Sequence, residues 1–386
     1  MSYLIIVFAF ILPISTAATS AVGGLIILLW IIEGDFKNKI REIINNKIAV
    51  IVICYIMLHI IALIWTNNMS MAWYMVSKQW KLLLLPVLLN IVRKEHIKYY
   101  FNAFILGMAI CVLISYLLFF EIINLQQAVI LSDPLPFHSH ISYNILLCMA
   151  ICLLIQSCLL ENLKKTDLII YVGLIILMSI NVFLNRGRVG YAAFFVMILS
   201  VIFLHFKKNL IKGAVTALII VPIVFFGAYK GSSAFRQRID DTLYSIKNFE
   251  RDPYNSVGER LTFFFNSLEV IKNNPVIGVG TGDFPDEYRR INKIKSPALP
   301  NTNDPHNQYL LVLAQFGAVG FIIFCLLFYY QFNYAKQFRD NFTYIRFVFP
   351  TLYIVVMFGG TFLLAHSTGV LFSLFGAILY KDFKNS

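Results

Sequence analysis

Long apolar stretches separated by short polar ones run along nearly the whole chain. About 20 apolar residues cross the hydrocarbon part of a bilayer as a helix, and several stretches reach that length. The pattern predicts an all-α polytopic membrane protein with about 12 transmembrane helices and both termini on the same side. We place these spans at residues 3–17, 20–33, 48–66, 80–92, 99–123, 142–160, 168–185, 189–206, 213–229, 307–330, 346–364 and 367–380.

One long polar segment, residues 230–305, separates the ninth predicted span from the tenth. Its 76 residues are too many for a simple connector. Within it, residues 259–273 predict an amphipathic helix, because apolar side chains recur there at helical spacing. These are Leu261, Phe264, Phe265, Leu268 and Ile271. A glycine-rich stretch at 278–282 follows and predicts a tight turn. We therefore expect a single membrane domain over residues 1–386 with one large, partly helical loop.

Composition supports a membrane location and gives the chain an orientation. The sequence is 59% hydrophobic, with a mean hydropathy of +0.74 and a net charge of +12. With both termini cytoplasmic, the inner loops hold 17 of the 32 basic residues and the short outer loops hold only four. The remaining 11 lie in the 230–305 loop beside 10 acidic residues. Positive charge collects on the cytoplasmic side of membrane proteins, so the large loop is expected outside and no nucleic-acid partner is implied.

The most specific candidate for chemistry is His306, where the long loop meets a predicted membrane helix. Asp304 is expected to cap that helix, and Pro305 suits its first turn. This would place His306 among the free backbone N–H groups. The positive end of the helix dipole there favours a neutral, proton-accepting imidazole and also attracts anions such as phosphate.

Three arginines are expected on the same outer face. Arg186 and Arg188 lie in the turn between the seventh and eighth spans, and Arg260 opens the predicted loop helix. Guanidinium binds phosphate oxygens through paired hydrogen bonds and stays charged, which suits a diphosphate ligand. Contact with lipid headgroups, or a salt bridge in the case of Arg260, is the simpler alternative for each one alone.

Other polar residues at the outer edge carry weaker signals. Lys78 and Lys81 flank Trp80 and are placed to meet a lipid phosphate, with ordinary membrane anchoring as the first interpretation. Asp133, His138 and His140 lack the spacing of a metal site, so no metal is expected there.

Several of these residues fall in a recognisable arrangement. The run Pro305-His306-Asn307-Gln308-Tyr309-Leu310, with ten residues between His306 and Gly317, resembles the hallmark of the O-antigen ligase and polymerase superfamily. The run from Asn274 to Gly282 resembles the Pro-hydrophobic-hydrophobic-Gly-x-Gly segment that precedes this histidine. Arg260 fits the family arginine upstream of that segment. Arg188-Val189-Gly190 resembles the family's arginine turn, although the usual serine is replaced and Arg186-Gly187 offers a competing alignment.

The resemblance implies a GT-C-like membrane glycosyltransferase that is inverting and independent of metals and other cofactors. It implies an O-antigen ligase that moves glycan from undecaprenyl diphosphate to lipid A–core in the assembly of lipopolysaccharide. His306 would be the catalytic base, and Arg188 and Arg260, with Arg186 as the competing residue, would bind the diphosphate. The protein would lie among the lipids of the bacterial inner membrane with its active site facing the periplasm.

Three alternatives to a ligase stay open. An O-antigen polymerase shares the motifs and the donor, and a protein O-oligosaccharyltransferase shares the chemistry. A membrane transporter is the non-enzyme alternative. Transporters typically carry ionisable groups at the membrane midplane, whereas those of this chain, apart from His59, lie near the ends of the spans.

Overall fold

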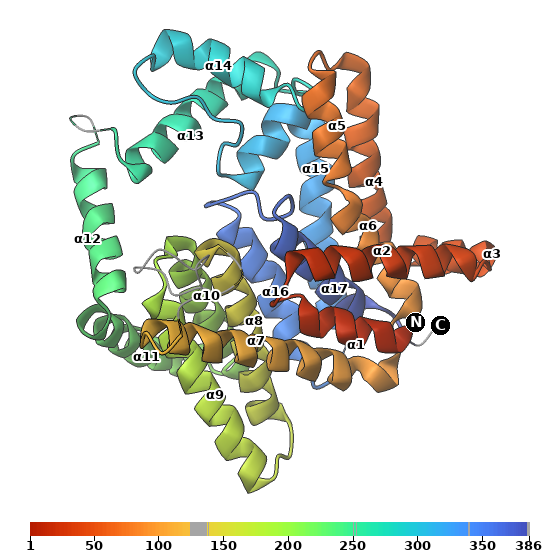
Figure 1. The fold of residues 1–386 in the computed structure, drawn as a ribbon, viewed down its shortest axis with the longest axis vertical. Coiled ribbons are helices and arrows are strands. Elements are labelled where there is room, and N and C mark those ends of the chain that lie inside the picture. The colour runs from red at the N-terminus through yellow and green to blue at the C-terminus, as the bar shows by residue number, and fades with distance from the viewer. Residues whose placement is uncertain (124–136, 138, 250, 252, 339, 384–386) are drawn as a thin grey trace.

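The computed structural model describes residues 1–123, 137, 139–249, 251, 253–338 and 340–383, and in these residues all regular structure is helical. Seventeen α-helices and two short 3₁₀ helices follow one another (Figure 1). They are α1 Ser2–Ile11, α2 Thr16–Ile32, α3 Phe36–Asn45, α4 Lys47–Ile61, η1 Ala62–Trp65, α5 Met69–Ser77, α6 Trp80–Ile91, η2 Lys94–His96, α7 Ile97–Phe119, α8 His140–Leu160, α9 Lys165–Leu184, α10 Arg188–His205, α11 Leu210–Gly231, α12 Ser233–Lys247, α13 Ser256–Asn273, α14 Phe284–Lys295, α15 Gln308–Gln337, α16 Thr343–Val356 and α17 His366–Tyr380.

The prediction of an all-α polytopic membrane protein is confirmed. Seven helices of the described chain are long and apolar enough to cross a membrane, or eight if α2 and α3, bent by 118° at a short break, form one span. The seven include or coincide with α4, α7, α8, α9, α10, α11 and α15. The other five predicted spans correspond to α1, α2, α6, α16 and α17, which are shorter, so the expected number of about 12 is not reached by helices of spanning length.

The most deeply buried element is α17. Every residue from Ser367 to Tyr380 is buried, and the helix packs mainly against α6, with further contacts to α8 and α15. A 15-residue helix is about 22 Å long, which is shorter than the roughly 30 Å hydrocarbon layer. A helix that is apolar on all sides belongs in a core, which explains why hydropathy alone marked it as a span.

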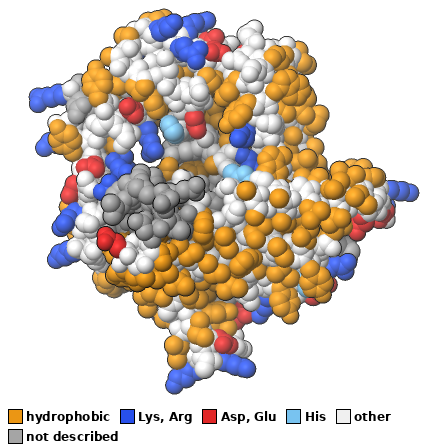
Figure 2. Space-filling view, viewed as in Figure 1, with side chains coloured by type: hydrophobic (Ala, Val, Ile, Leu, Met, Phe, Trp, Pro, Cys, Tyr) orange, Lys and Arg blue, Asp and Glu red, His pale blue; other side chains and the backbone are white. Residues whose placement is uncertain are grey.

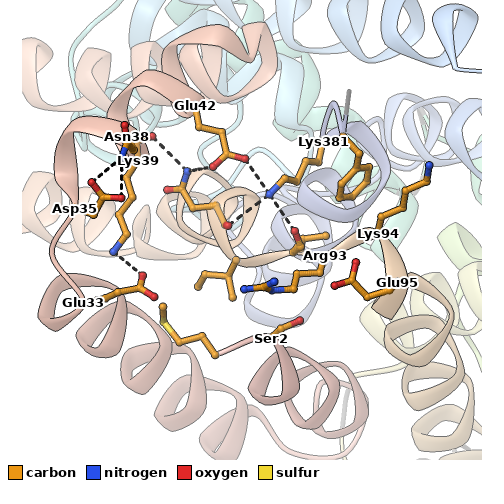
Figure 3. A pocket seen from close by; sticks show the side chains of 15 residues that line it. Ser2, Glu33, Asp35, Asn38, Lys39, Glu42, Arg93, Lys94, Glu95 and Lys381 are labelled. Atoms are coloured by element: carbon orange, nitrogen blue, oxygen red, sulfur yellow. Dashed lines mark hydrogen bonds and ion pairs between the residues drawn. The ribbon is translucent and has the colours of Figure 1, made fainter. Parts of the chain in front are cut away.

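Both chain termini lie close together at one end of the molecule (Figure 1). Met1, Ser2 and Phe383 line a polar cavity of about 690 Å³ there, together with charged residues of α3 and η2 (Figure 3). Many of these charges are paired with each other. Lys39 pairs with Glu33 at 2.8 Å, and Lys381 pairs with Glu42 at 2.9 Å. The first pair joins α3 to the end of α2, and the second joins the chain just after α17 to α3, so charges of this cavity hold these segments together.

The segment from α12 to α14 lies at another end, with α13 and α14 grouped above the start of α15 (Figure 1). The predicted loop helix is confirmed as α13, which begins three residues early because the Asn255 side chain accepts hydrogen bonds from Val257 and Gly258. Of the five apolar residues that predicted this helix, however, Phe264, Phe265 and Leu268 are exposed, and Ile271 packs against a buried cluster. The buried side carries Phe263, Val270 and small polar residues.

Residues 274–282 lie against a break in α15. At Gly317 the helix adopts φ 59° and ψ −155°, so its hydrogen-bond ladder is interrupted. The freed groups bond instead to the 274–282 segment, as buried backbone groups must find partners. The four bonds are Val279 N to Ala314 O at 2.8 Å, Gly280 N to Gln315 O at 2.9 Å, Ala318 N to Pro275 O at 2.8 Å and Val319 N to Val276 O at 3.2 Å. The glycine-rich stretch is therefore docked on α15, and it also contains a turn, at residues 281–282.

Glycine is required on both sides of this contact. A Cβ on Gly317 would lie 2.3 Å from the carbonyl carbon of Val276, and one on Gly278 would lie 2.3 Å from that of Gln315. Both glycines also have positive φ, which residues with a Cβ rarely adopt. The two backbones can approach this closely only without side chains, and the approach fixes α13 and α14 relative to α15.

The other end of the segment is anchored by Asp283. Its carboxylate, with only 4% of the residue exposed, accepts the backbone N–H groups of Asn67 and Asn68, each at 2.8 Å. These residues form the start of α5, so one carboxylate satisfies free N–H groups at a helix beginning. The connection joins the loop to α4 and α5 as well as to α15.

Candidate active site

Four arginines meet in a small cavity of about 70 Å³ between the helical bundle and the loop helices. Arg186 and Arg188 come from the α9–α10 connection, Arg238 from α12 and Arg260 from α13. Figure 2 shows basic and histidine side chains gathered around a hollow below α13 and α14, on a face that is otherwise largely hydrophobic. The three arginines singled out in the sequence are thus brought together.

Backbone dipoles add to the positive potential at this cavity. Arg188 is the first residue of α10, and Ser256 is the first residue of α13, so two helix N-termini meet there. The Arg188 guanidinium donates to the Ser256 hydroxyl at 3.0 Å, and Arg186 donates to Gln237 at 3.0 Å. Helix N-termini and guanidinium groups both bind phosphate, so the arrangement is suited to an anion.

Much of the arginine charge is not neutralised by the protein. Within the described residues, no carboxylate lies within 4.0 Å of the guanidinium of Arg188, Arg238 or Arg260. The Nε atoms of Arg188 and Arg238 are buried and have no hydrogen-bond partner in the part of the chain that the structure describes. Because an unpaired buried donor is costly, these groups indicate a ligand that supplies acceptors and negative charge.

The electrostatics of Arg260 also favour a negatively charged ligand. Burial lowers the pKa of Arg260, and the neighbouring charge of Arg238 lowers it further, whereas the charge of Asp304 opposes both effects. Two guanidinium groups that raise each other's free energy would be stabilised by a bound anion. Asp304 lies close enough for its charge to act on Arg260, so the arginine cavity and the histidine segment interact electrostatically.

The local structure around His306 differs from the predicted one. The cap of α15 is Asn307, whose side chain accepts from the backbone of Tyr309 and Leu310 at 2.9 and 3.1 Å. His306 therefore lies before the helix, with φ 51°, and its N–H bonds the Asp304 carboxylate at 2.8 Å. The prediction that Asp304 caps the helix with His306 in the first turn is wrong, because Asn307 occupies that position.

The His306 ring is held by stacking on α13. Its centroid lies 5.9 Å from that of Phe263, with an angle of 26° between the rings. Phe263 and Arg260 are three residues apart, so they share one side of the helix. No described residue hydrogen bonds to the ring nitrogens of His306, which is half-buried. The imidazole is thus positioned near the arginines with its nitrogens available to a substrate.

A larger cavity of about 820 Å³ borders the same histidine segment. It lies between α5, the residues around Asn303 and the connection between α16 and α17, and Asp304 is part of its wall. Thr361 donates to the Asp304 carboxylate at 2.6 Å. Asp304 therefore contributes to the wall of this cavity and, through its charge, to the environment of Arg260.

Sequence reasoning missed Arg238. Arg236 and Arg238 are both basic residues of α12, and hydropathy does not distinguish them. The packing of α12 beside α9 and α13 decides which one faces the cavity. The candidate metal ligands Asp133 and His138, and the side chain of His140, lie outside the described residues. Elsewhere in the described chain no group of three or more potential metal ligands occurs.

The fold and this site define a polytopic membrane protein with an arginine cluster and an adjacent histidine at one face. Residues 173–325 match the O-antigen ligase family, so this part of the chain is similar to that family. The matched residues include all four arginines, His306 and Gly317. The family comprises membrane ligases and polymerases that act on lipid-linked glycans. No curated protein matches the chain.

Proposed function

We propose that this protein is an O-antigen ligase that transfers a glycan from undecaprenyl diphosphate to a hydroxyl of lipid A–core. The observation that carries the proposal is the arginine cavity: among the described residues the buried Nε atoms of Arg188 and Arg238 have no partner, two helix N-termini meet there, and the half-buried His306 lies beside it. Such a cavity fits a diphosphate attached to a membrane lipid. The similarity of residues 173–325 to the O-antigen ligase family supports the same class of substrate.

In the proposed reaction the acceptor hydroxyl attacks the anomeric carbon of the donor sugar. The new bond forms between the acceptor oxygen and this carbon, and the hydroxyl proton passes to the neutral His306 imidazole. The bond from the anomeric carbon to the diphosphate oxygen breaks, and its electron pair leaves with undecaprenyl diphosphate. Attack from the side opposite the leaving group inverts the anomeric configuration.

The arginines act on the leaving group in this scheme. Arg188, Arg238 and Arg260 hold the diphosphate and stabilise the negative charge that grows on it, with Arg186 at the edge of the same cavity. Preorganised donors of this kind need no rearrangement as the charge develops. We place the cavity on the periplasmic side of the inner membrane, with both termini cytoplasmic, because the basic residues concentrate in the loops of the opposite side.

A comparison of His306→Ala with His205→Ala tests the role of the histidine. Both proteins would be purified into lipid nanodiscs and given a defined undecaprenyl-diphosphate glycan and lipid A–core. Loss of a general base lowers kcat by about 100- to 10,000-fold, whereas His205, which bonds Tyr344 at the far end of α10, should be dispensable. Normal transfer by a folded His306→Ala protein would contradict the assignment of this residue as the base.

A deletion strain distinguishes the ligase from its alternatives. Bare lipid A–core together with accumulated long glycan on undecaprenyl diphosphate is the result expected for a ligase. Core that carries a single repeat unit would instead indicate a polymerase. Unchanged lipopolysaccharide would contradict both and would direct the search to glycosylated proteins or to transport.

A further inference from the structure

The 820 Å³ cavity beside the histidine segment differs from the arginine cavity in its lining. Its walls combine apolar side chains with hydrogen-bonding groups. The apolar residues Met71, Met75, Leu311 and Leu364 belong to, or pack against, the cluster that contains Phe263, the residue stacked on His306. Sugar rings have both apolar C–H faces and hydroxyl groups, so a mixed lining of this kind suits a saccharide.

A lysine lines this cavity and a second lies close to it. Lys78 is part of the lining, and the buried Lys81 donates to the carbonyl of Leu364, a lining residue. Among the described residues neither has a carboxylate within 4.0 Å.

Asp304, the acidic residue in the cavity wall, forms no ion pair with Lys78 within 4.0 Å in the described part of the chain. Its carboxylate accepts the Thr361 hydroxyl and the N–H of His306. The Lys78 ammonium lies over the face of Tyr74, 4.6 Å from the ring centre, so this contact holds the ammonium at the cavity wall. His366, also in the wall, lies 5.8 Å from Trp80 with the two rings tilted by 54°.

We propose that this cavity binds the polar headgroup of the acceptor, and that Lys78 selects an acceptor carrying an anionic substituent such as a phosphate. The inference rests on the proposed function, since it assigns the second substrate of that reaction. Asp304 lines this cavity, and the nearby His306 stacks on Phe263 of the helix that carries Arg260, so the two substrates approach the histidine from separate binding sites. The acceptor's anionic group pairs with Lys78 while its hydroxyl reaches toward His306.

Steady-state kinetics with two acceptors test the assignment. Wild type, Lys78→Ala, Lys78→Arg and the control Lys293→Ala would be assayed in nanodiscs of neutral lipid. The acceptors would be lipid A–core with and without its sugar phosphates. Loss of one charge-assisted bond should raise the KM of Lys78→Ala for the phosphorylated acceptor about 10- to 100-fold. The KM for the donor should stay unchanged, and Lys78→Arg should restore binding. Lys293 is exposed on α14, so its substitution should change neither constant.

Each other result has a distinct meaning. An unchanged acceptor KM in Lys78→Ala, or an equal rise for both acceptors, would overturn the role of Lys78 while leaving the proposed reaction intact. A Lys78→Ala effect that appears only when anionic phospholipid is added would assign the lysine to ordinary membrane lipid and would also overturn the proposal. If the wild type transfers glycan to neither acceptor, the proposed function itself fails.

Discussion

Replacing Gly317 with alanine should separate the 274–282 segment from α15. Gly317 has φ 59° and ψ −155°, a backbone conformation that is almost restricted to glycine. The added Cβ would also lie 2.3 Å from two backbone atoms of Val276 and 2.6 Å from the N atom of Ile277. Because all three contacts are with backbone, no side-chain rotation can relieve them.

The size of the effect follows from these contacts. Holding alanine in such a conformation costs about 1–3 kcal/mol. If the segment moves away instead, the four backbone hydrogen bonds across the break are lost, at about 1 kcal/mol net for each. Strain alone leaves the added Cβ 2.3 Å from the backbone of Val276, so the segment must move, and we expect a loss of stability of about 4 kcal/mol. The second response would also move α13, and with it Phe263 and Arg260.

Thermal inactivation of the purified protein, with proteolysis of the 230–305 region as a second readout, measures this loss. Gly173→Ala in α9 is the matched control, because nothing lies within 4 Å of its added Cβ and alanine favours a helix by up to about 1 kcal/mol. Gly317→Ala should inactivate at a lower temperature and be cleaved sooner, while the control stays at or above wild type. Equal behaviour of the two variants would refute the steric argument.

Two further substitutions test the arginine cavity and the loop anchor. Arg238→Ala should raise the KM for the lipid diphosphate donor about 10- to 100-fold, since a charge-assisted hydrogen bond is worth about 1.5–3 kcal/mol. Arg236→Ala, on the exposed side of the same helix, should leave this KM unchanged, and equal effects of the two substitutions would argue against donor binding in the cavity. Asp283→Asn should lower stability by about 2–4 kcal/mol, because an amide presents only one acceptor to the N–H groups of Asn67 and Asn68. Thermal inactivation checks this, with Glu287→Gln in α14 as the control, and an unchanged inactivation temperature for Asp283→Asn would contradict it.

The sequence determined the features that depend on local pattern. Hydropathy identifies the membrane helices because each must be apolar along its own length, and helical spacing identifies α13. The distribution of basic residues predicts that Arg186, Arg188, Arg260 and His306 share a face, since loops alternate between the two sides of a membrane. The structure brings the three arginines into one cavity, with the histidine stacked beside them on α13.

Only the tertiary structure decided the features that depend on partners distant in the chain. Three features join segments that are far apart in sequence: the contribution of Arg238 to the arginine cavity, the docking of residues 274–282 in the break of α15, and the cavity lined by Lys78. Even the cap of α15 depended on context, since Asp304 and Asn307 are both suitable residues and Asp304 is bonded to Thr361. Local periodicity reports which side of a helix is apolar, but the packing of other helices determines what that side meets, as the exposed stripe of α13 demonstrates.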